Sequence, residues 1–524
     1  MSTNQSSHPK DCEKFAIDTS NALESQMTNG TSGTLESAEL RPRFSVLAAV
    51  GMQYSISATP LAVGGYLTFI LGVGGSPYFF YCFLVAAFGQ MLVCISLAEI
   101  AAVYPHASGQ VFWTAALSPP EWARFLSYWN GASTTLGWVF ANAGTYVFAA
   151  QIFLGAIMVR FPDYVAKSYQ VFLIAVACGV IGILLNTLLF KIYPAVSKFM
   201  VWFINAGTIF IFVALLTRTT PKASARQVFI DVVNETGWSS NGLVFLLGFL
   251  PGSVAIACFD TAAHMAEEMD QPDRQVPQVM IGASLLCALS AIPMIITFLF
   301  CTTNPYTLLN PIGGQPVYQV LHDAFHSDGL LVVALIIYCV VYISSCPAAI
   351  ATASRLIWSF VKHGGMPGAR WIGEVHPVMQ VPLNAILLTV FASCLISLLV
   401  FGPSTVLNGV FGAGGICFAF SYGMPIWLLL LRGRSQLPKK RYCNLGKIGV
   451  PLNILAVCWQ LISVTFLSFP LYRPVTLGNM NWASACGAVG LGIFVVNWFV
   501  YSRRNFRPPR QLYVRNLQQT ETDA

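Results

Sequence analysis

Long stretches of this chain contain no Asp, Glu, Lys or Arg, and the two longest cover residues 44–98 and 375–431. A charged side chain at the centre of a bilayer costs at least about 2.5 kcal/mol on insertion scales, so long charge-free runs indicate membrane-spanning helices. Only 9% of the 524 residues are charged and 56% are hydrophobic, which excludes most soluble folds. The sequence predicts a polytopic membrane protein.

The lengths of these runs predict about twelve transmembrane helices in an all-α fold, because one crossing takes about 20 residues. The two longest runs, of 55 and 57 residues, each hold two helices. The second half of the run 275–322 contains Asn-Pro and Gly-Gly pairs and is predicted to be a loop. The predicted helices are 44–72, 76–103, 125–157, 169–190, 195–217, 241–267, 278–302, 329–360, 384–401, 405–431, 449–470 and 481–502.

The basic residues predict the orientation of these helices. If both termini are cytoplasmic, most Lys and Arg residues lie on the inner side, as the positive-inside rule requires. The net charge of +7 then follows from topology and contact with the lipid bilayer, and it requires no nucleic-acid partner. We expect a disordered cytoplasmic tail at 1–42, a ten-helix core at 43–431, a basic cytoplasmic loop at 432–448, helices 11 and 12 at 449–502, and a cytoplasmic tail at 503–524.

Two of the predicted spans are interrupted. Residues 55–60 read Ser-Ile-Ser-Ala-Thr-Pro, and residues 248–253 read Gly-Phe-Leu-Pro-Gly-Ser. Proline breaks a helix and frees backbone groups that lipid cannot satisfy, so these groups must face a cavity or a ligand. The first five helices (43–217) would relate to the next five (241–431) by inverted topology, as in alternating-access carriers. The alternative is a pair of ordinary kinks, since Gly and Pro are common in membrane helices.

A few charged side chains lie within or beside the spans and are candidates for coupling or gating. Asp260 and His264 are four residues apart, hence on one helical face, and Glu267 lies on nearly the same stripe. Arg355 needs an anion, which Asp260, Glu267 or Glu99 would supply at an inner gate. Arg355 would otherwise extend to a lipid phosphate.

Three further polar side chains and one sequon complete the candidates. Ser344 and Ser345 lie about midway along the eighth span, and the ammonium of Lys198 in the fifth would replace a sodium ion and couple transport to protons. The alternative for Lys198 is an inner-boundary lysine. Asn234 begins the sequon Asn234-Glu235-Thr236 in an outer loop and is a glycosylation candidate. The sequence has no metal-binding, nucleophile or Walker-type motif, so neither a cofactor nor an enzymatic reaction is expected.

Four segments carry a resemblance to a known family: Ser96 to Trp113, Pro119 to Phe125, Phe259 to Pro277, and Arg355 to Pro367. With the hydrophilic joint at 431–451, they resemble the amino acid/choline transporter branch of the amino acid-polyamine-organocation (APC) superfamily. Within that branch, the fungal permeases for choline, 4-aminobutyrate and similar amines are the most similar.

The resemblance implies a LeuT-type fold of ten core helices plus two, with substrate between the interruptions. The implied substrate-binding residues are Ser55, Ser57, Ala58, Thr59, Trp138, Asn142, Ser253, Val254 and Phe259. A choline-like cation would favour an aromatic cage, which Tyr54, Trp138 and Phe259 would build, whereas an amino acid carboxylate would favour exposed N–H groups. The sequence does not choose between these substrates.

We therefore expect a secondary transporter of the plasma membrane that takes up a small amine or amino acid together with a proton. Two alternatives share the scaffold, namely an exporter of a small secondary metabolite and a nutrient-sensing receptor without transport. The sequence predicts neither the direction of flux nor an oligomeric state.

Overall fold

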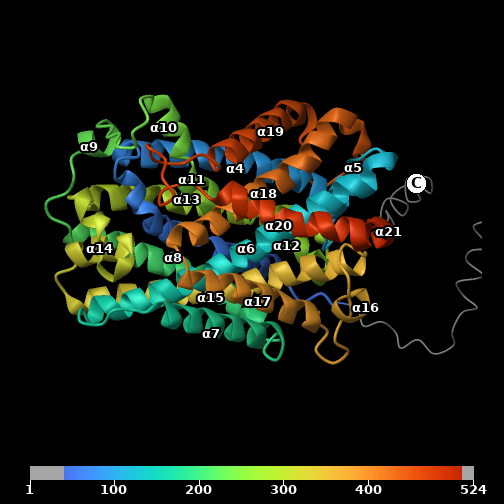
Figure 1. Ribbon diagram of the computed structural model, residues 1–524, viewed down its shortest axis with the longest axis horizontal. Helices are drawn as coiled ribbons and strands as arrows, with labels where there is room; N and C mark the ends of the chain where they lie inside the picture. The colour runs from blue at the N-terminus through green and yellow to red at the C-terminus, as the bar shows by residue number, and fades with distance from the viewer. Residues whose placement is uncertain (1–39, 510–524) are drawn as a thin grey trace, which may run out of the picture. The chain divides into compact units, whose positions relative to one another are not determined.

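The computed structural model describes residues 40–509 of the chain. Within this range the structure is helical, and the one extended pairing is a single bridge between Val73 and Asn234 (Figure 1). Most of the expected tails, 1–42 and 503–524, lie outside the described residues. The predicted all-α architecture is confirmed for the described part of the chain.

Eleven helical segments of this part are long and apolar enough to cross a membrane, and a twelfth span is divided into short pieces. This agrees with the expected number of about twelve. The eleven are α2–α3–η1 (Val46–Ser57, Thr59–Ala62, Val63–Ile70), α4 (Gly75–Ala101), α6 (Pro120–Arg160), α7 (Ser168–Asn186), α8 (Tyr193–Arg218), α13 (Pro272–Cys301), α15 (Asp328–Lys362), α17–η5 (Leu383–Ser397, Leu398–Phe401), α18 (Ser404–Arg432), α19 (Gly449–Phe466) and α20–η8 (Ala483–Asn497, Trp498–Ser502).

Short helices connect the spans. The predicted loop after α13 contains α14 (Pro316–Ala324) and two single turns, η3 (Pro305–Leu309) and η4 (Ile312–Gly314), all too short to span a bilayer. The remaining connecting helices are α5 (Gln110–Leu117), α9 (Ala225–Phe229), α16 (Ala369–Ile372), η6 (Arg434–Gln436), η7 (Gly446–Ile448) and α21 (Arg503–Asn505).

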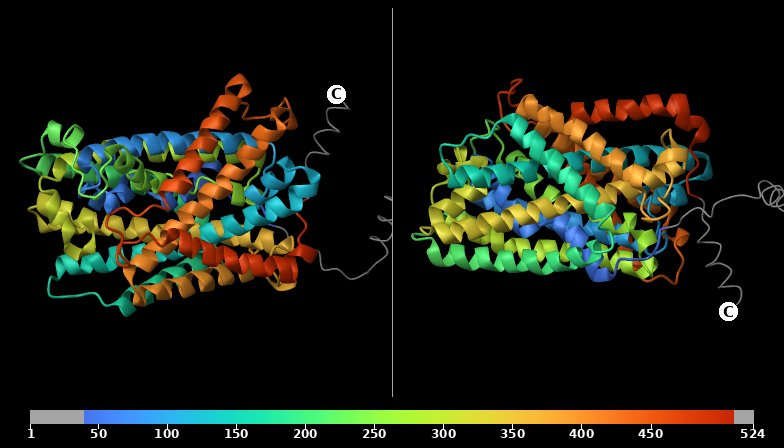
Figure 2. Two further views of the ribbon diagram at one scale, coloured as in Figure 1. Left: turned by 45° about the horizontal axis from the view of Figure 1, so that its top comes forward. Right: turned by 90° about the horizontal axis from the view of Figure 1, so that it is seen from below.

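Small residues allow the central helices to pack closely. Helix α6 packs against both α15 and α18, and these helices lie side by side in both orientations of the molecule (Figures 1 and 2). On α6, Gly131 faces the ring of Phe360 on α15, and Gly144 faces the ring of Phe411 on α18. On α2, a Cβ at Gly51 would lie 2.0 Å from the carbonyl oxygen of Ser197 on α8, so only glycine permits that contact.

The two ends of the bundle differ in charge. One end carries the end of α4, the start of α6, the end of α15 and the basic loop at 432–448. We call this end the basic end, and it lies on the right in Figure 1, near α5, α16 and α21. The opposite end carries α9, α10 (Asn241–Leu247) and α14.

The first span is interrupted where the sequence predicts it. Helix α2 ends at Ser57, and Ala58 adopts a left-handed conformation with φ +37°. Pro60 lies in the first turn of α3, where a missing N–H is tolerated, and the span continues as the 3₁₀ helix η1. The interruption at residues 57–59 is therefore built into the sequence by Pro60.

The sixth span unwinds later than the predicted position at residues 248–253. Gly248 ends α10, but Pro251 lies in the first turn of a new helix, α11 (Leu250–Ala255). The chain then unwinds over Ile256 to Asp260, where Cys258 has φ +64°, before α12 (Thr261–His264) and η2 (Ala266–Glu268). The expected position of the main break is corrected by about two turns, because a proline in a first turn starts a helix and does not end one.

Candidate functional site

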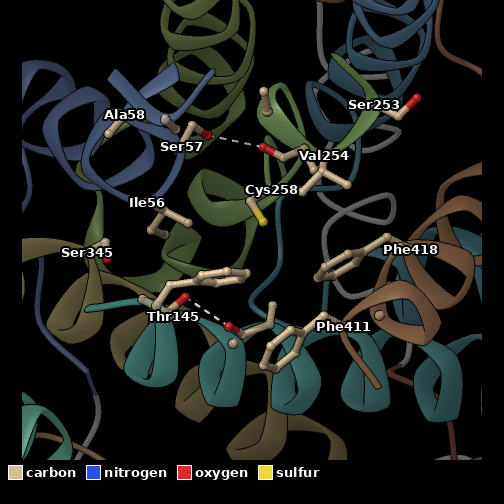
Figure 3. A pocket seen from close by; sticks show the side chains of 18 of the residues that line it. Ile56, Ser57, Ala58, Thr145, Ser253, Val254, Cys258, Ser345, Phe411 and Phe418 are labelled. Carbon is tan, nitrogen blue, oxygen red and sulfur yellow. Dashed lines mark hydrogen bonds between the residues drawn. The ribbon is translucent and has the colours of Figure 1, made fainter. Parts of the chain in front are cut away.

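A pocket of about 220 Å³ lies between the two interrupted spans. Its walls come from α2, α3, η1, α4, α6, α11 with the unwound segment that follows, α15, α18 and α19. In Figure 3, Ser57, Val254 and Cys258 lie across the space from Thr145 and Phe411. The pocket thus lies where helical hydrogen bonding is broken in two spans at once.

The lining combines aromatic rings with hydroxyl and amide groups, and it contains no side chain of Asp, Glu, Lys, Arg or His. The rings are those of Tyr66, Phe140, Phe148, Tyr342, Phe411, Phe418 and Tyr422. The other hydrogen-bonding side chains are Ser55, Ser57, Gln90, Thr145, Ser253, Gln315, Ser345, Gln460 and Ser463. A charged group entering this pocket meets ring faces and dipoles, with no fixed charge of opposite sign in the wall.

Side chains of the protein bind the carbonyl groups near the second break. The hydroxyl of Thr59 donates to the Ala255 carbonyl at 2.7 Å, and the hydroxyl of Ser57 donates to the Ala257 carbonyl at 3.3 Å. The amide of Gln90 on α4 donates to the carbonyl of Ser253 at 2.7 Å. These bonds join the two interrupted spans and satisfy carbonyls that the helix no longer binds.

Five of the nine predicted substrate-binding residues line the pocket: Ser55, Ser57, Ala58, Ser253 and Val254. The other four, Thr59, Trp138, Asn142 and Phe259, are fully buried outside the lining. Thr59 binds the Ala255 carbonyl, and Asn142 donates to the carbonyls of Trp138 at 3.0 Å and Ala349 at 3.2 Å. These four residues therefore support the wall from behind.

The expected aromatic cage is corrected by the structure. Tyr54, Trp138 and Phe259 are each 0% exposed and do not line the pocket. Three of the seven rings that do line it come from α18, a helix on which we predicted no binding residue. Phe411, Phe418 and Tyr422 are spaced by seven and four residues and therefore lie on one face of that helix. That periodicity was the signal available in the sequence.

Asp260 lies immediately after the unwound segment and is surrounded by hydrogen-bond donors. Its Oδ2 accepts from the amide of Gln110 at 2.7 Å and the indole of Trp138 at 3.1 Å, and it lies 3.0 Å from Nε2 of His264. Its Oδ1 accepts from the hydroxyl of Tyr422 at 2.8 Å. The predicted placement of Asp260 and His264 on one face is confirmed, and both side chains are 0% exposed.

Tyr422 connects this carboxylate to the pocket. Its ring lines the pocket and packs on Phe259 with a centroid distance of 4.5 Å, while its hydroxyl binds Asp260. It also stacks on Phe418, at 5.6 Å. A solute in the pocket is therefore separated from the buried carboxylate by one side chain.

Arg355 forms a buried ion pair with Glu268, and not with Asp260, Glu267 or Glu99 as expected. Its Nε lies 2.8 Å from Oε1 of Glu268, and the two side chains are 0% and 1% exposed. The backbone carbonyl of Glu268 also accepts from the N–H groups of Arg43 and Phe44. The expectation is wrong about the partner because residues 266–268 form a 3₁₀ turn, which rotates Glu268 inward relative to an α-helix.

Glu99 anchors the basic loop. Its Oε1 accepts from Nη2 of Arg441 at 2.6 Å and from the backbone N–H of Leu445 at 3.0 Å, and it pairs with Arg434 at 2.5 Å. Glu99 is 0% exposed. Its position thus fastens the loop after α18 to the end of α4 and corrects the expected pairing with Arg355.

Glu267 lies at the basic end, with Oε1 3.9 Å from Nε2 of His106. His106 belongs to the connection between α4 and α5, where burial, with smaller effects of His363 and Lys362, lowers its pKa to about 3. The imidazole is therefore neutral near pH 7, and the contact with Glu267 is then not an ion pair.

The remaining coupling candidates differ in position. Lys198 is exposed on α8, so the expected internal position of its ammonium group is corrected. Ser345 lines the pocket and donates to the Tyr342 carbonyl at 2.6 Å. Ser344 is outside the lining and donates to the Val341 carbonyl at 2.7 Å. Their placement supports a role in the wall for Ser345 alone.

The glycosylation candidate Asn234 is half-buried in the connection before α10. Its amide nitrogen donates to the Trp238 carbonyl at 2.9 Å and to Asn241 at 3.1 Å, and its oxygen accepts from the Thr236 hydroxyl at 2.7 Å. The folded structure therefore uses the amide that a glycan would modify.

The twelve spans within residues 40–509, two of them interrupted around a pocket, define a multi-pass membrane transporter. The chain belongs to the amino acid permease family, whose model matches residues 44–494. Members of this family are transporters and not enzymes.

Similar proteins include several fungal transporters. The choline transporter of Saccharomyces cerevisiae is 27% identical over 513 residues, which cover 97% of this chain and 89% of that protein. A putative amino acid/polyamine transporter of Macrophomina phaseolina is 26% identical and covers 83% of this chain and 97% of its own length. The swainsonine transporter of Arthroderma benhamiae is 26% identical and covers 92% and 96%.

The fold matches solved transporters with the LeuT-type arrangement. A manganese transporter of Eremococcus coleocola superimposes with a TM-score of 0.51, covering 89% of this chain and 97% of that chain. The two sequences are 14% identical, so this likeness concerns the fold alone.

Proposed function

We propose that this permease is a secondary active transporter that takes up a small amine, with a choline-like quaternary amine as the first candidate, by proton-coupled alternating access. The observation that carries the proposal is the pocket between the two interrupted spans, which is lined by aromatic rings and hydroxyl groups and contains no carboxylate. The likeness to the choline transporter of Saccharomyces cerevisiae supports the same substrate class.

The chemistry of the wall favours a quaternary amine over a primary amine. A primary ammonium group presents three N–H donors and needs acceptors. Two carbonyls beside the pocket, those of Ala255 and Ala257, each already accept one hydrogen bond, from Thr59 and Ser57 respectively, so one lone pair of each is used. A quaternary ammonium group needs no acceptor and gains from ring faces by about 0.5–2 kcal/mol for each well-placed ring. Phe411, Phe418 and Tyr422 supply such rings on one helix face.

The basic end supports alternating access. The Arg355–Glu268 pair and the hydrogen-bonded cluster around Asp260 lie on the side of the pocket that faces this end. The pair joins the sixth span to α15, and the cluster joins the sixth span to α6 and α18. Opening toward the basic end requires these contacts to separate. We propose that residues 43–217 and 241–431 are inverted repeats that move relative to each other in this step.

We propose that the basic end faces the cytoplasm, with both termini on that side of the plasma membrane. The support is the position of the basic loop and of Arg124, Lys362 and Arg432 at this end. Accessibility of the 432–448 loop to a protease from each side of sealed vesicles tests this orientation.

Uptake into proteoliposomes tests the function. Labelled choline, 4-aminobutyrate and a panel of amino acids are supplied with an imposed proton gradient, and we expect choline to accumulate more than the others. The matched variants are Ser57→Leu, which places a larger side chain in the wall, and Ser344→Leu, which changes the same residue type outside the lining. Accumulation of 4-aminobutyrate or an amino acid, without choline, would overturn the quaternary-amine assignment. No flux of any of these compounds would overturn the uptake function.

A second candidate is export of a small secondary metabolite. The observation in its favour is the 26% identity to the swainsonine transporter of Arthroderma benhamiae over nearly the whole chain. The direction of net flux in whole cells that express the protein distinguishes the two functions, since an exporter lowers the cellular content of its substrate.

A further inference from the structure

Both ring nitrogens of His264 face hydrogen-bond acceptors. Nδ1 lies 2.8 Å from the carbonyl oxygen of Ala107, and Nε2 lies 3.0 Å from Oδ2 of Asp260. A carbonyl oxygen only accepts, so Nδ1 must carry hydrogen to form the first bond. The second contact then needs a further proton, held on Nε2 or on the carboxylate.

The neutral histidine with an ionised Asp260 does not fit this geometry. With hydrogen on Nδ1, the lone pair of Nε2 faces a carboxylate oxygen. With hydrogen on Nε2, the lone pair of Nδ1 faces the Ala107 carbonyl. Either arrangement brings two acceptors into contact between side chains that are 0% exposed, where water cannot relieve them. Loss of the shared proton must therefore break one of the two contacts.

The other partners of Asp260 favour the proton on His264. Its Oδ2 already accepts from Gln110 and Trp138, so the arrangement most compatible with all contacts is an ionised carboxylate that receives a third N–H from a protonated imidazole. The proton adds to the Nε2 lone pair of His264 and is shared with Oδ2. The pair then carries no net charge in its buried position, which removes the cost of an unpaired buried carboxylate.

We propose that Asp260 and His264 together bind the transported proton, and that this structure, closed at the basic end, is the form in which the proton is bound. This inference rests on the proposed function as a proton-coupled carrier, and it adds the binding site of the proton. Release of the Nε2 proton to water at the basic end leaves His264 neutral, so the Nε2 lone pair faces Oδ2 of Asp260 and the contact between the two side chains breaks.

The position of the pair connects proton binding to both the pocket and the basic end. Toward the pocket, Tyr422 donates to Oδ1 of Asp260 while its ring lines the substrate space. Toward the basic end, Ala107 belongs to the connection between α4 and α5, and Gly109 approaches the His264 ring so closely that a Cβ there would lie 3.0 Å from Cε1. The shared proton therefore holds the His264 ring between Asp260 and this connection.

The pH response of the pair depends on the titratable groups around it. Around α12 and Asp260, these are Tyr54 on α2, His106 beside Ala107, Tyr422 on α18, Cys258 in the unwound segment, Cys94 on α4, Arg355 on α15, Glu267 and Glu268 on η2, and Asp273 and Arg274 at the start of α13. Arg355 is paired with Glu268, and the thiols and phenols are uncharged near neutral pH. His264 is the basic side chain in contact with Asp260.

The test uses His264→Gln with His322→Gln as the matched control. His322 has a half-exposed side chain on α14, at the opposite end from the pair. In proteoliposomes with the membrane potential held at zero, a pH gradient of one unit supports about tenfold accumulation of labelled choline by a carrier that moves one proton with it. We expect this accumulation in the wild type and in His322→Gln. His264→Gln should reduce the ratio to about one while still exchanging labelled for unlabelled choline, because the introduced amide donates to Asp260 without titrating.

A spectroscopic measurement provides a second readout that does not depend on transport. In ¹⁵N-histidine NMR spectra of the purified full chain at pH 7.5, the resonances absent from His264→Gln should have the shifts of a doubly protonated imidazole. Asp260→Asn should convert them to a neutral ring. A neutral His264 in the wild type would overturn the inference, as would undiminished gradient-driven accumulation by His264→Gln. A wild-type protein that exchanges choline but does not accumulate it in response to the pH gradient would refute proton coupling and leave choline transport intact. Failure of the proton-site inference is thus distinguished from failure of the proposed choline transport.

Discussion

Replacing Glu268 by Gln should open the basic end. Glu268 is 1% exposed and pairs with Arg355, which is 0% exposed, at 2.8 Å. Removing one partner of a buried ion pair costs about 3–5 kcal/mol, because the other charge stays buried without a counter-ion. Phe190 lies 5.0 Å from the Arg355 guanidinium and offsets a small part of this cost. The cost applies only to conformations in which Arg355 is buried.

The expected magnitude follows from these energies. At 1.4 kcal/mol for each factor of ten, the closed form loses about 10² to 10³-fold in population relative to forms in which Arg355 meets water. Cys258 reports this shift, since it is the one cysteine in the pocket lining. We expect a membrane-impermeant maleimide, applied on the side of the basic end, to alkylate Cys258 much faster in Glu268→Gln than in the wild type.

The controls separate gating from general loosening. Glu121→Gln removes an exposed carboxylate at the start of α6, also at the basic end, and should leave the alkylation rate unchanged. Cys258→Ser identifies the modified peptide by mass spectrometry. A combined replacement of Glu268 and Arg355 by Met should restore slow alkylation, because no buried charge remains. Equal rates in Glu268→Gln and the wild type would refute the assignment of this pair as a gate.

Three further predictions follow from the same structure. Tyr422→Phe keeps the ring in the pocket and removes the donor to Asp260, so it should retain choline binding by scintillation proximity but shift the pH profile of uptake; an unchanged profile would separate the pocket from the carboxylate. Glu99→Gln leaves Arg434 and Arg441 without their negatively charged partner and should lower the free energy of unfolding by about 3 kcal/mol, measured against Glu121→Gln; equal thermal midpoints would contradict the anchoring role. The pKa of His106 is about 3 in the folded chain and about 6.5 when unfolded, so the unfolded state binds more protons and stability falls as pH drops from about 6.5 toward 3; His106→Asn should flatten this loss in a thermal melt, and identical acid profiles would refute it.

The spans are predictable from the sequence because burying charge in lipid is costly at every position. The charge-free runs therefore locate the helices with errors of a few residues at their ends. Pro60 likewise fixes the first interruption locally, since no helix continues normally through it. These features depend on single residues and on the solvent, so they need no knowledge of tertiary contacts.

The second break shows where local reasoning fails. Pro251 is tolerated in the first turn of α11, and the unwinding occurs where Thr59 and Ser57 bind the carbonyls of Ala255 and Ala257. The donor and the acceptor of these two bonds are 196 and 200 positions apart in the sequence. A pattern within one span cannot show them.

The candidate site was predictable only where it depends on local spacing along one helix. The spacing of Asp260 and His264 correctly placed both on one face, because α12 extends from one to the other. Glu268 was missed as the partner of Arg355 because the chain changes from α to 3₁₀ geometry just before it. The rings of α18 were not predicted as binding residues because their spacing shows a common face but not whether that face meets lipid, another helix or a substrate.

Protection of Cys258 by substrate shows whether the two interrupted spans hold the transported solute. Wild-type proteoliposomes are alkylated with a small maleimide at increasing choline concentrations, and modification of Cys258 is followed by mass spectrometry. We expect choline to slow the modification of Cys258, with half-maximal protection at the concentration that half-saturates uptake. Choline uptake that proceeds while Cys258 reacts at the same rate at every concentration would show that the solute binds elsewhere.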